Sequence, residues 1–508
     1  MRSLAELVPR SAEAHPDRPA LAAGERMVSY AELGERVHRA AAALHDLGVR
    51  KGDRVALFLG NVPAFVEALH GALRIGAVVA PLNVMLTPEE AGSILGDAGA
   101  RVVVAEPSHL PTVLAVRDRV ASLGHVVVTG SPPVPRGTAS FEELLARAGE
   151  PPGVDVREED LALLAYTAGT TARPKGAMLT HGNLVANLEQ VSAVPALKEA
   201  HSDVILGVLP LFHIYALNAV LGVALREGAT LVLVERFDPA GTLELVERHR
   251  VTVLPGAPQM FAAWLSAAEG REVDLSSVRL AVSGAAPLPA EVLDAFQRRF
   301  GVTIWEGYGL TETAPAVTTN ALAEVAKGDS IGLALPGVEV RLVDEAGEDV
   351  VEGDPGEIVL RGANVFQGYW NRPEETDAAF RDGWFRTGDV AYRDDDGYLF
   401  IVDRKKDLII VSGFNVFPKE VEEALARHPA VAECAVVGVP DERTGEAARA
   451  LVVLGEGRSA TEEELLDHCR DHLARFKWPK TIEVVDRLPK HATGKVLRRM
   501  LRDGDPAP

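Results

Sequence analysis

The stretch from Leu161 to Leu179 reads LALLAYTAGTTARPKGAML and joins an apolar beginning to a polar remainder. The beginning, Leu161 to Tyr166, predicts a strand that is buried on both faces. The remainder, 167–176, is rich in glycine and threonine and ends in a lysine followed by glycine. Glycine lets the backbone approach a ligand closely, threonine hydroxyls and backbone amides donate to phosphoryl oxygens, and lysine supplies positive charge. The stretch therefore predicts a phosphate-binding loop after a buried strand.

The spacing of this loop differs from that of the Walker A loop, G-x-x-x-x-G-K-[ST]. Gly169 precedes Lys175 by six positions, and glycine follows the lysine, so kinase or GTPase geometry is not implied. An ordinary surface turn with scattered threonines is the alternative. The dense order T-x-G-T-T-x-x-P-K-G favours the ligand loop over that alternative.

The segment from Tyr166 to Gly176 resembles the phosphate-loop signature of the adenylate-forming superfamily, which includes acyl-CoA and aryl-CoA synthetases, luciferases and peptide-synthetase adenylation domains. The resemblance extends over nearly the whole chain. Two residues depart from the signature, because Ala168 stands where the family usually has serine and Ala172 where it usually has glycine. Losing one hydroxyl donor costs about 1 kcal/mol of phosphate binding. The resemblance assigns cofactor binding in this loop to Thr167, Gly169, Thr170, Thr171 and Lys175.

The composition limits the classes of protein to which the chain can belong. The 508 residues are too many for one core, and the net charge of −21 argues against nucleic acid as a partner. A local excess of Lys and Arg between Asp471 and Arg499 is the exception to this acidic balance. The two cysteines, Cys434 and Cys469, have no metal-ligand spacing, so neither a disulfide framework nor a zinc site is indicated. We expect a cytoplasmic protein.

Two stretches bear on membrane association. The first residues, MRSLAELVPRSAEAHP, lack the apolar core of a signal peptide. The stretch from Val204 to Leu225 has no formal charge and is long enough to span a bilayer, but Pro210, His213 and Asn218 interrupt it. We therefore expect a buried strand, turn and helix there, and not an integral membrane protein.

The order of elements predicts an α/β fold. Strands alternate with helices through the first part of the chain, for example in a helix that begins at the capping box Ser29–Glu32 and another at Thr87–Glu90. We expect a large N-terminal domain, 1–403, with two doubly wound sheets in 1–329 and a small β-barrel-like subdomain in 330–403. A small α+β C-terminal domain, 404–508, follows, and the resemblance implies that it is mobile about a hinge at 403–407.

Two glycine turns at strand ends, 283–287 (SGAAP) and 306–313 (EGYGLTET), together resemble the adenine slot of the family. The resemblance implies that Tyr308 stacks on the base, Thr311 touches the α-phosphate and Glu312 binds Mg²⁺, a hard cation that prefers carboxylate and phosphate oxygens. Alone, Glu312 is also consistent with a solvated surface acid. The other cofactor-binding residues expected here are Gly284, Ala285, Ala286, Glu306, Gly307 and Gly309.

The segment VLPLFHIYALN, 208–218, places His213 in apolar surroundings. Alone, such a histidine is more often a hydrogen-bonded core residue. The matching family histidine lies beside the acyl site, and the segment is similar to that of the 4-coumarate-CoA ligase branch. The resemblance implies an acyl pocket that includes Ile214, Tyr215, Asn218 and Pro315.

The remaining motifs lie toward the C-terminus. By resemblance, Asp389 accepts hydrogen bonds from the ribose hydroxyls, Arg404 is a second ribose and phosphate contact, and Lys406 is the hinge pivot. Ser412, Gly413 and Phe414 resemble the segment that lines the pantetheine tunnel. The segment 489–495 (PKHATGK) resembles the C-terminal catalytic-lysine loop. Lys495 would there stabilise charge between the carboxylate and the α-phosphate.

Taken together, these motifs predict an ATP- and Mg²⁺-dependent carboxylate-CoA ligase. It would form an acyl-AMP and pyrophosphate, then acyl-CoA and AMP, with coenzyme A as the acceptor. We expect a medium- or long-chain fatty acid as the substrate, with a 4-coumarate-like aryl acid as the alternative. Transfer to a carrier protein, a catalytically degenerate homologue and a phosphotransferase are the competing hypotheses. The expected oligomeric state is a monomer or homodimer.

Overall fold

The computed structural model describes residues 1–130, 133–167, 174–323, 326–404, 409–411, 414–416, 418–441, 444–473, 475–490, 496 and 498–502. The chain forms two compact units. One comprises Met1–Glu339 and Leu360–Phe385, and the other comprises Val340–Val359 and Arg386–Pro508.

The first sheet has seven strands in the order β7-β6-β5-β3-β4-β8-β9. All neighbours pair in parallel except β8 and β9, which form an antiparallel hairpin. Buried valine, alanine and leucine side chains fill β3 and β5, as expected for parallel strands covered on both faces. The strands are β3 (Arg54–Phe58), β4 (Val78–Pro81), β5 (Ala100–Ala105), β6 (His125–Val128), β7 (Ala139–Ser140), β8 (Leu161–Thr167) and β9 (Lys175–Thr180).

The second sheet has nine strands in the order β16-β15-β14-β13-β12-β10-β11-β1-β2. Its centre is parallel, while β2, β15 and β16 run antiparallel to their neighbours. The fold class expected from the sequence, with two doubly wound sheets, is confirmed. The strands are β1 (Pro19–Ala23), β2 (Arg26–Ser29), β10 (Val204–Gly207), β11 (Thr230–Leu233), β12 (Val253–Gly256), β13 (Leu280–Ser283), β14 (Ile304–Gly309), β15 (Ala316–Thr319) and β16 (Leu333–Ala334).

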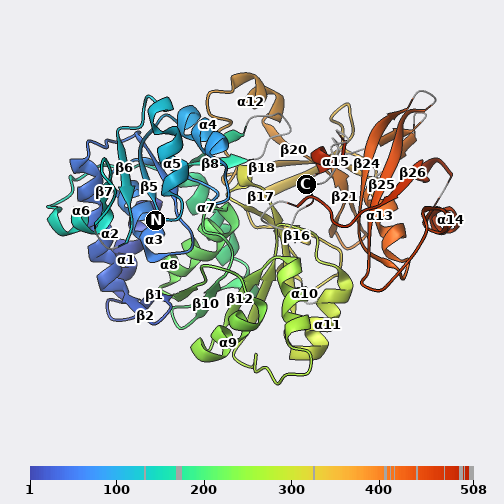
Figure 1. Ribbon diagram of the computed structural model, residues 1–508, viewed down its shortest axis with the longest axis horizontal. Coiled ribbons are helices and arrows are strands. Elements are labelled where there is room, and N and C mark those ends of the chain that lie inside the picture. Colours follow the sequence, from blue (N-terminus) through green and yellow to red (C-terminus); the bar gives the residue numbers. More distant parts are fainter. Residues whose placement is uncertain are drawn as a thin grey trace. The chain divides into compact units, whose positions relative to one another are not determined.

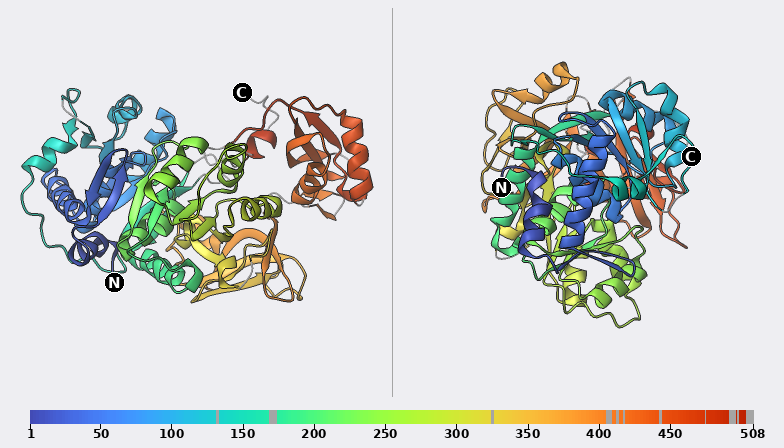
Figure 2. Two further views of the ribbon diagram at one scale, coloured as in Figure 1. Left: turned by 90° about the horizontal axis from the view of Figure 1, so that it is seen from below. Right: turned by 90° about the vertical axis from the view of Figure 1, so that its left-hand side faces the viewer.

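Helices of the N-terminal region connect the two sheets, which lie side by side in Figures 1 and 2. The buried hydroxyl of Tyr30 donates to the carbonyl oxygens of Ala224 at 3.1 Å and Ala229 at 2.6 Å, beside the second sheet. The helices of this unit are α1 (Leu7–Ala14), α2 (Tyr30–Asp46), α3 (Pro63–Arg74), α4 (Pro88–Ala98), α5 (Leu110–Val116), α6 (Phe141–Arg147), α7 (His181–Ser192), α8 (Val223–Glu227), α9 (Pro239–His249), α10 (Pro258–Ala267), α11 (Ala290–Phe300) and α12 (Pro373–Ala379).

The helix starts predicted at Ser29 and Thr87 and the fold predicted for 204–225 are present in the structure. The capping box at Thr87 forms completely. At Ser29 the side chain caps the Glu32 amide, but the Glu32 carboxylate accepts from Arg26 at 2.6 Å. The stretch 204–225 folds as β10, a π-helix (Tyr215–Gly222) and the start of α8. No helix within the described ranges is long and apolar enough to cross a membrane.

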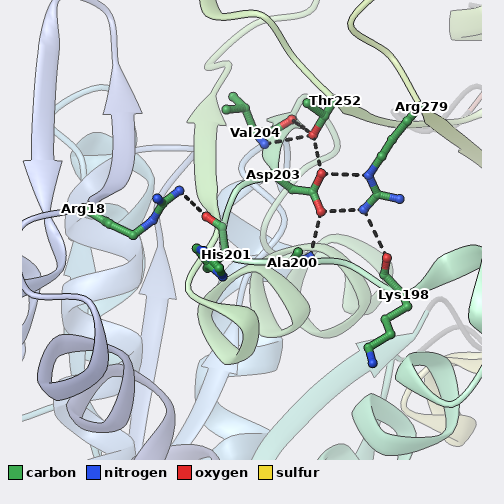
Figure 3. Close-up of polar contacts among 8 residues, drawn as sticks. All are labelled: Arg18, Lys198, Ala200, His201, Asp203, Val204, Thr252 and Arg279. Atoms are coloured by element: carbon green, nitrogen blue, oxygen red, sulfur yellow. Dashed lines mark hydrogen bonds and ion pairs between the residues drawn. The ribbon is translucent and has the colours of Figure 1, made fainter.

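An ion pair fixes the segment between α7 and β10, as Figure 3 shows. Asp203 accepts from Arg279 Nε at 2.8 Å and Nη2 at 2.5 Å, from Thr252 Oγ1 at 2.7 Å and from the Ala200 amide at 2.7 Å. Arg279 also donates to the Lys198 carbonyl at 3.1 Å. Because Asp203, Thr252 and Arg279 directly precede β10, β12 and β13, this cluster joins the beginnings of three strands and holds residues 198–203 against them.

Two further sheets follow in the chain. One is a five-stranded antiparallel sheet of β17 (Val338–Val343), β18 (Gly356–Gly362), β20 (Trp384–Arg393), β19 (Phe380–Arg381) and β21 (Leu399–Arg404). The other consists of β23 (Phe414–Val416), β22 (Ile409–Val411), β25 (Gly445–Leu454), β24 (Val431–Asp441) and β26 (Thr481–Val484), with the helices α13 (Pro418–Ala426), α14 (Glu462–His472) and α15 (Arg498–Arg502) nearby in the sequence. A core cluster that includes Val421, Val436 and Leu465 joins α13, β24 and α14.

Two buried histidines lie beneath the N-terminus. His181, at the start of α7, accepts from the Leu4 amide at 3.2 Å through Nδ1, and His70 lies in α3. Burial lowers the pKa of each imidazole to about 4. Both rings are therefore neutral in the folded protein at pH 7.

We expect these histidines to make the protein acid-sensitive. Their pKa is about 6.5 when unfolded, so the unfolded state binds more protons at acid pH. The contribution of the neutral histidines to the free energy of unfolding should be complete above pH 6.5 and should fall as the pH is lowered toward 4. The loss should approach about 3 kcal/mol for each histidine. Urea unfolding at several pH values should show a shallower acid slope for His70→Gln than for the wild type, and equal slopes would contradict this assignment.

Candidate functional site

The hairpin of β8 and β9 carries the predicted phosphate loop. Thr167 and Lys175 are paired across its end, so the two residues that bound the loop lie opposite each other. Lys175 Nζ lies 5.2 Å from the centre of the Tyr369 ring. The Tyr369 hydroxyl donates to Glu312 Oε1 at 2.8 Å. The structure thus brings the predicted phosphate lysine to the ring, and the predicted metal ligand to the hydroxyl, of one tyrosine side chain.

A polar cluster anchors this hairpin from α4. Asp97 accepts from the Tyr166 hydroxyl and from Arg372 Nη2, both at 2.8 Å, and its carbonyl accepts from Trp370 Nε1 at 3.1 Å. A cavity of about 220 Å³ lies here, lined by Ser93, Ile94, Asp97, Tyr166, Pro174 and Arg372. Tyr166 and Pro174 flank the loop, so the cluster fixes the base from which the loop emerges.

The two predicted glycine turns of the adenine slot meet at the ends of β13 and β14. A Cβ atom on Gly284 would lie 3.4 Å from the Gly307 carbonyl oxygen, so the two turns touch. Glu306 is 3% exposed, and its Oε1 accepts from the Leu288 amide at 3.1 Å. Its carboxylate therefore supports the turn that contains Ala285 and Ala286. Ala285 is exposed and has a φ of 72°, a conformation that non-glycine residues rarely adopt.

The loop after β14 carries Thr311 and Glu312 in a 3₁₀ turn (Thr311–Thr313). Tyr308 pairs with Thr318 of β15 just before it. A Cβ atom on Gly309 would lie 2.0 Å from the Pro315 carbonyl oxygen, so only glycine permits this close return of the chain. Glu312 is 9% exposed, and its carbonyl accepts from the Phe366 amide at 2.9 Å. Glu312 is therefore a held, largely buried carboxylate and not the solvated surface acid.

Buried amide side chains hold the loop 313–316 by hydrogen bonds to its backbone. Asn187 exchanges two hydrogen bonds with the Ala316 backbone at 2.7 and 3.0 Å. Asn364 donates to carbonyls 313 and 316 at 2.9 and 3.2 Å, and Asn218 donates to carbonyl 314 at 2.6 Å. All three amides are at most 1% exposed. Sequence reasoning missed Asn187 and Asn364, for which the only local signal is a polar residue in a buried stretch.

The residues expected in the acyl pocket surround the start of the π-helix. His213 accepts from the Tyr215 amide through Nδ1 at 3.4 Å, and Ile214 is buried. The Tyr215 hydroxyl donates to the Val282 carbonyl at 3.1 Å, and a Cβ atom on Gly284 would lie 3.1 Å from its ring. Burial, and secondly the charge of Glu199, raise the pKa of Tyr215, so its hydroxyl is neutral. Asn218 lies beneath Ala314, the neighbour of buried Pro315, and acts as a support of the loop.

The predicted ribose-binding residues belong to the other compact unit. Asp389 is 3% exposed, and its amide donates to Thr387 Oγ1 at 3.1 Å. Asp389 and Arg404 are direct partners in the register of β20 and β21. The two residues that the resemblance assigns to one ligand are therefore neighbours in the fold.

Several predicted residues lie outside the described part of the chain. These are Gly169, Thr170 and Thr171 of the loop, together with Lys406, Ser412, Gly413 and Lys495. Phe414 belongs to β23 and pairs with Val411. Within the described ranges, no group of three or more His, Cys, Asp and Glu side chains could hold a metal ion.

Comparison with known proteins gives the family. The model of the AMP-binding enzyme family matches residues 8–370, and that of the AMP-binding enzyme C-terminal domain matches 420–495. The chain is 43% identical to feruloyl-CoA synthase of Amycolatopsis sp over 97% of both chains. It is 40% identical to long-chain-fatty-acid–CoA ligase of Yersinia pestis over 99% of this chain and 94% of that protein.

Among solved structures, ATP-bound MatB from Rhodopseudomonas palustris superposes with a TM-score of 0.90 at 35% identity, over 99% of both chains. The family models, the relatives and the solved structure all match the chain over most of its length and indicate the same family. The chain belongs to the AMP-binding enzyme family, the adenylate-forming superfamily that its phosphate-loop segment resembles.

Proposed function

We propose that this AMP-forming acid–CoA ligase activates an aromatic carboxylic acid that carries a polar group at the far end of its ring, as hydroxycinnamates do. The observation that carries this substrate class is the buried carboxyl of Glu199, whose charge acts on Tyr215. Glu199 is 9% exposed, and among the described residues its Oε2 has no hydrogen-bond partner. A buried polar atom without a partner is costly, and a ligand that supplies the missing hydrogen bond would relieve that cost.

The protonation state of Glu199 suits this role. Burial, followed by the charge of Asp203, raises the pKa of Glu199 well above its usual value. Burial therefore favours the protonated form of the carboxyl, which can both donate and accept a hydrogen bond. Its segment, 198–203, is held by the Asp203–Arg279 pair of Figure 3. A fixed acid in its protonated form can bind a phenolic hydroxyl without the free-energy cost of burying an ionised carboxylate.

The Tyr215 side chain supports the same substrate class. Its ring lies against Gly284 and its hydroxyl is fixed to strand β13, so it forms a flat and rigid wall. Flat walls suit flat aromatic acids. The identity of 43% with a feruloyl-CoA synthase agrees with this proposal.

A medium- or long-chain fatty acid is the second candidate. Relatives that are 36% to 40% identical carry the name long-chain-fatty-acid–CoA ligase. Val317 in β15 and Ala257, which follows β12, are buried apolar residues and would suit an alkyl chain. A long alkyl chain that reached Glu199 would, however, leave the carboxyl without a partner.

ATP would bind with its triphosphate at the β8–β9 loop and its adenine beside Tyr308. The carboxylate of Glu312 is held in place and is a hard oxygen donor, which fits Mg²⁺ because this ion commonly combines one or two carboxylates with substrate phosphates. When bound, Mg²⁺ would neutralise charge on the phosphates. Lys175 adds positive charge at the same end of the hairpin.

The reaction would proceed in two steps. A carboxylate oxygen attacks the α-phosphorus of ATP, the bond to pyrophosphate breaks, and an acyl-AMP forms. The thiolate of coenzyme A then attacks the acyl carbon and AMP leaves. Lys495 would stabilise the first transition state, and rotation at 403–407 would replace it by the 412–414 segment for the second step. These hinge, tunnel and lysine roles rest on the sequence resemblance.

The proposal is tested by AMP release from purified protein with ATP and Mg²⁺. Ferulate, 4-coumarate, benzoate, octanoate and palmitate are compared, each with and without coenzyme A. CoA-dependent release with ferulate or 4-coumarate in preference to palmitate is expected. Preference for palmitate would support the fatty-acid candidate, and AMP release that requires an acyl carrier protein would redirect the proposal to that acceptor. ADP as the product would contradict adenylation.

We expect Lys495→Ala to separate the two half-reactions. Adenylation should fall by about 100-fold, the scale of losing one preorganised charge stabiliser, while thioester formation from supplied acyl-AMP survives. Pyrophosphate exchange and single-turnover thioester assays measure the two steps. Lys477→Ala is the matched control, because Lys477 lies outside the 489–495 segment, pairs with Glu420 at 2.7 Å, and its loss should leave both steps unchanged. Equal loss of both steps in Lys495→Ala would contradict the two-step division.

We expect Glu199→Leu to change the choice of acid. Removing the polar group should lower kcat/KM for ferulate about tenfold relative to octanoate, the scale of one lost hydrogen bond to a buried group. Glu199→Gln is the matched control, since it keeps the size and a polar tip, and should keep the preference for ferulate. An unchanged ferulate-to-octanoate ratio in Glu199→Leu would show that Glu199 does not contact the substrate.

A further inference from the structure

The segment Phe366–Arg372, here called the strap, pairs with the edge of β9 that β8 leaves open. The Met178 amide donates to the Gly368 carbonyl at 2.9 Å, and the Gln367 amide donates to the Met178 carbonyl at 3.0 Å. The Trp370 amide donates to the Gly176 carbonyl at 2.8 Å. The strap therefore runs along the phosphate-loop hairpin up to the residue next to Lys175.

The backbone of the strap is fixed at Gly368 and Tyr369. Gly368 has a φ of 122°, and a Cβ atom there would lie 2.4 Å from Thr376 Cγ2. The Tyr369 amide donates to Thr376 Oγ1 at 2.9 Å. Because α12 supplies Thr376, the first turns of that helix determine where the Tyr369 side chain points.

Tyr369 touches both charged residues of the candidate site. Its ring lies 5.2 Å from Lys175 Nζ, and its hydroxyl donates to Glu312 Oε1 at 2.8 Å. Phe366 packs edge-on against the ring, with centroids 4.9 Å apart. Lys175 belongs to the first sheet and Glu312 follows a strand of the second, so this one side chain bridges the two sheets at the site.

The hydrogen bond to Glu312 has a defined direction. A phenol carries an O–H donor and a carboxylate only accepts, so at 2.8 Å the Tyr369 hydroxyl donates to Glu312 Oε1. A donor fixed to Oε1 sets the orientation of the whole carboxylate plane. The ring face attracts the Lys175 ammonium and limits where its charge can lie.

We propose that Tyr369 is a positioning residue for the ATP-dependent step, which aims the Glu312 carboxylate at the divalent cation and the Lys175 ammonium at the phosphates. The inference rests on the function proposed above. Tyr369 itself need not contact a substrate. A tyrosine that served only the core would stabilise the fold without affecting how the protein responds to Mg²⁺.

The test compares Tyr369→Phe with Tyr30→Phe. Both substitutions remove a hydroxyl that donates a hydrogen bond, but among the described residues the Tyr30 hydroxyl bonds only the carbonyls of Ala224 and Ala229. Calorimetric titration measures ATP binding at low and high Mg²⁺, and pyrophosphate exchange gives the Mg²⁺ concentration for half-maximal rate. Tyr369→Phe should raise that concentration and the Kd of ATP at low Mg²⁺ about fivefold, the scale of one hydrogen bond. Tyr30→Phe should leave both values unchanged while lowering Tm.

A double-mutant cycle with Glu312→Gln separates positioning from a general loss of stability. If Tyr369 acts through Glu312, adding Tyr369→Phe to Glu312→Gln should not weaken Mg²⁺-dependent ATP binding further. Additive effects, or a Tyr369→Phe protein whose Mg²⁺ response equals that of the wild type, would overturn the inference. A wild-type protein that binds ATP but does not release AMP with any of the tested acids would instead overturn the proposed function. The comparison of Mg²⁺-dependent ATP binding would then still stand.

Discussion

The hydrogen bonds between residues 366–370 and the outer edge of β9 determine how the candidate site is assembled. Without them the β8–β9 hairpin would end the first sheet with an unpaired edge at the point where the phosphate loop begins. The same segment also reaches the second sheet, because the Phe366 amide donates to the Glu312 carbonyl. One short segment therefore sets the distance between Lys175, on the first sheet, and Glu312, which follows a strand of the second.

Much of the fold could be predicted from local sequence patterns. The buried strand at Leu161, the complete capping box at Thr87 and the interrupted apolar stretch at 204–225 all formed as expected. Strands β1 and β9 were not anticipated. β1 pairs with β11, whose residues lie about 200 positions away, and such partners leave no mark in a short window. Glu306 was assigned to the adenine slot by resemblance, which remains a prediction, and the hydrogen bond of its carboxylate with the Leu288 amide could not be foreseen from the sequence.

The supporting groups of the site were also hidden from sequence reasoning, for a physical reason. Asn187, Asn364 and Tyr369 belong to no motif with regular spacing, and their value depends on backbone carbonyls or charges that only the fold brings near. Asp97 is similar, since its partners Tyr166 and Arg372 are far from it in the sequence. Sequence motifs predicted the residues that contact the ligand. The structure identified the residues that hold those segments in place by hydrogen bonds.

Two carboxyl groups of the segment 198–203 show how environment decides charge. Burial raises the pKa of Asp203, but hydrogen bonds from Arg279, Thr252 and the Ala200 amide outweigh it, and the net shift is downward. Glu199, four positions earlier, lacks such donors among the described residues and has a raised pKa. Pairs of acids with opposite shifts often have different tasks. Here Asp203 holds the segment, and Glu199 is the acid that we propose contacts the substrate.

The most direct test of adenylation follows the oxygen atoms of the acid. Ferulate labelled with ¹⁸O in its carboxylate is incubated with the protein, ATP, Mg²⁺ and coenzyme A, and the AMP is analysed by mass spectrometry. Attack of the carboxylate on the α-phosphorus leaves one labelled oxygen in each AMP when the thiolate displaces it. The expected result is therefore AMP that carries a single ¹⁸O atom. Thioester formation with unlabelled AMP would contradict an acyl-AMP intermediate.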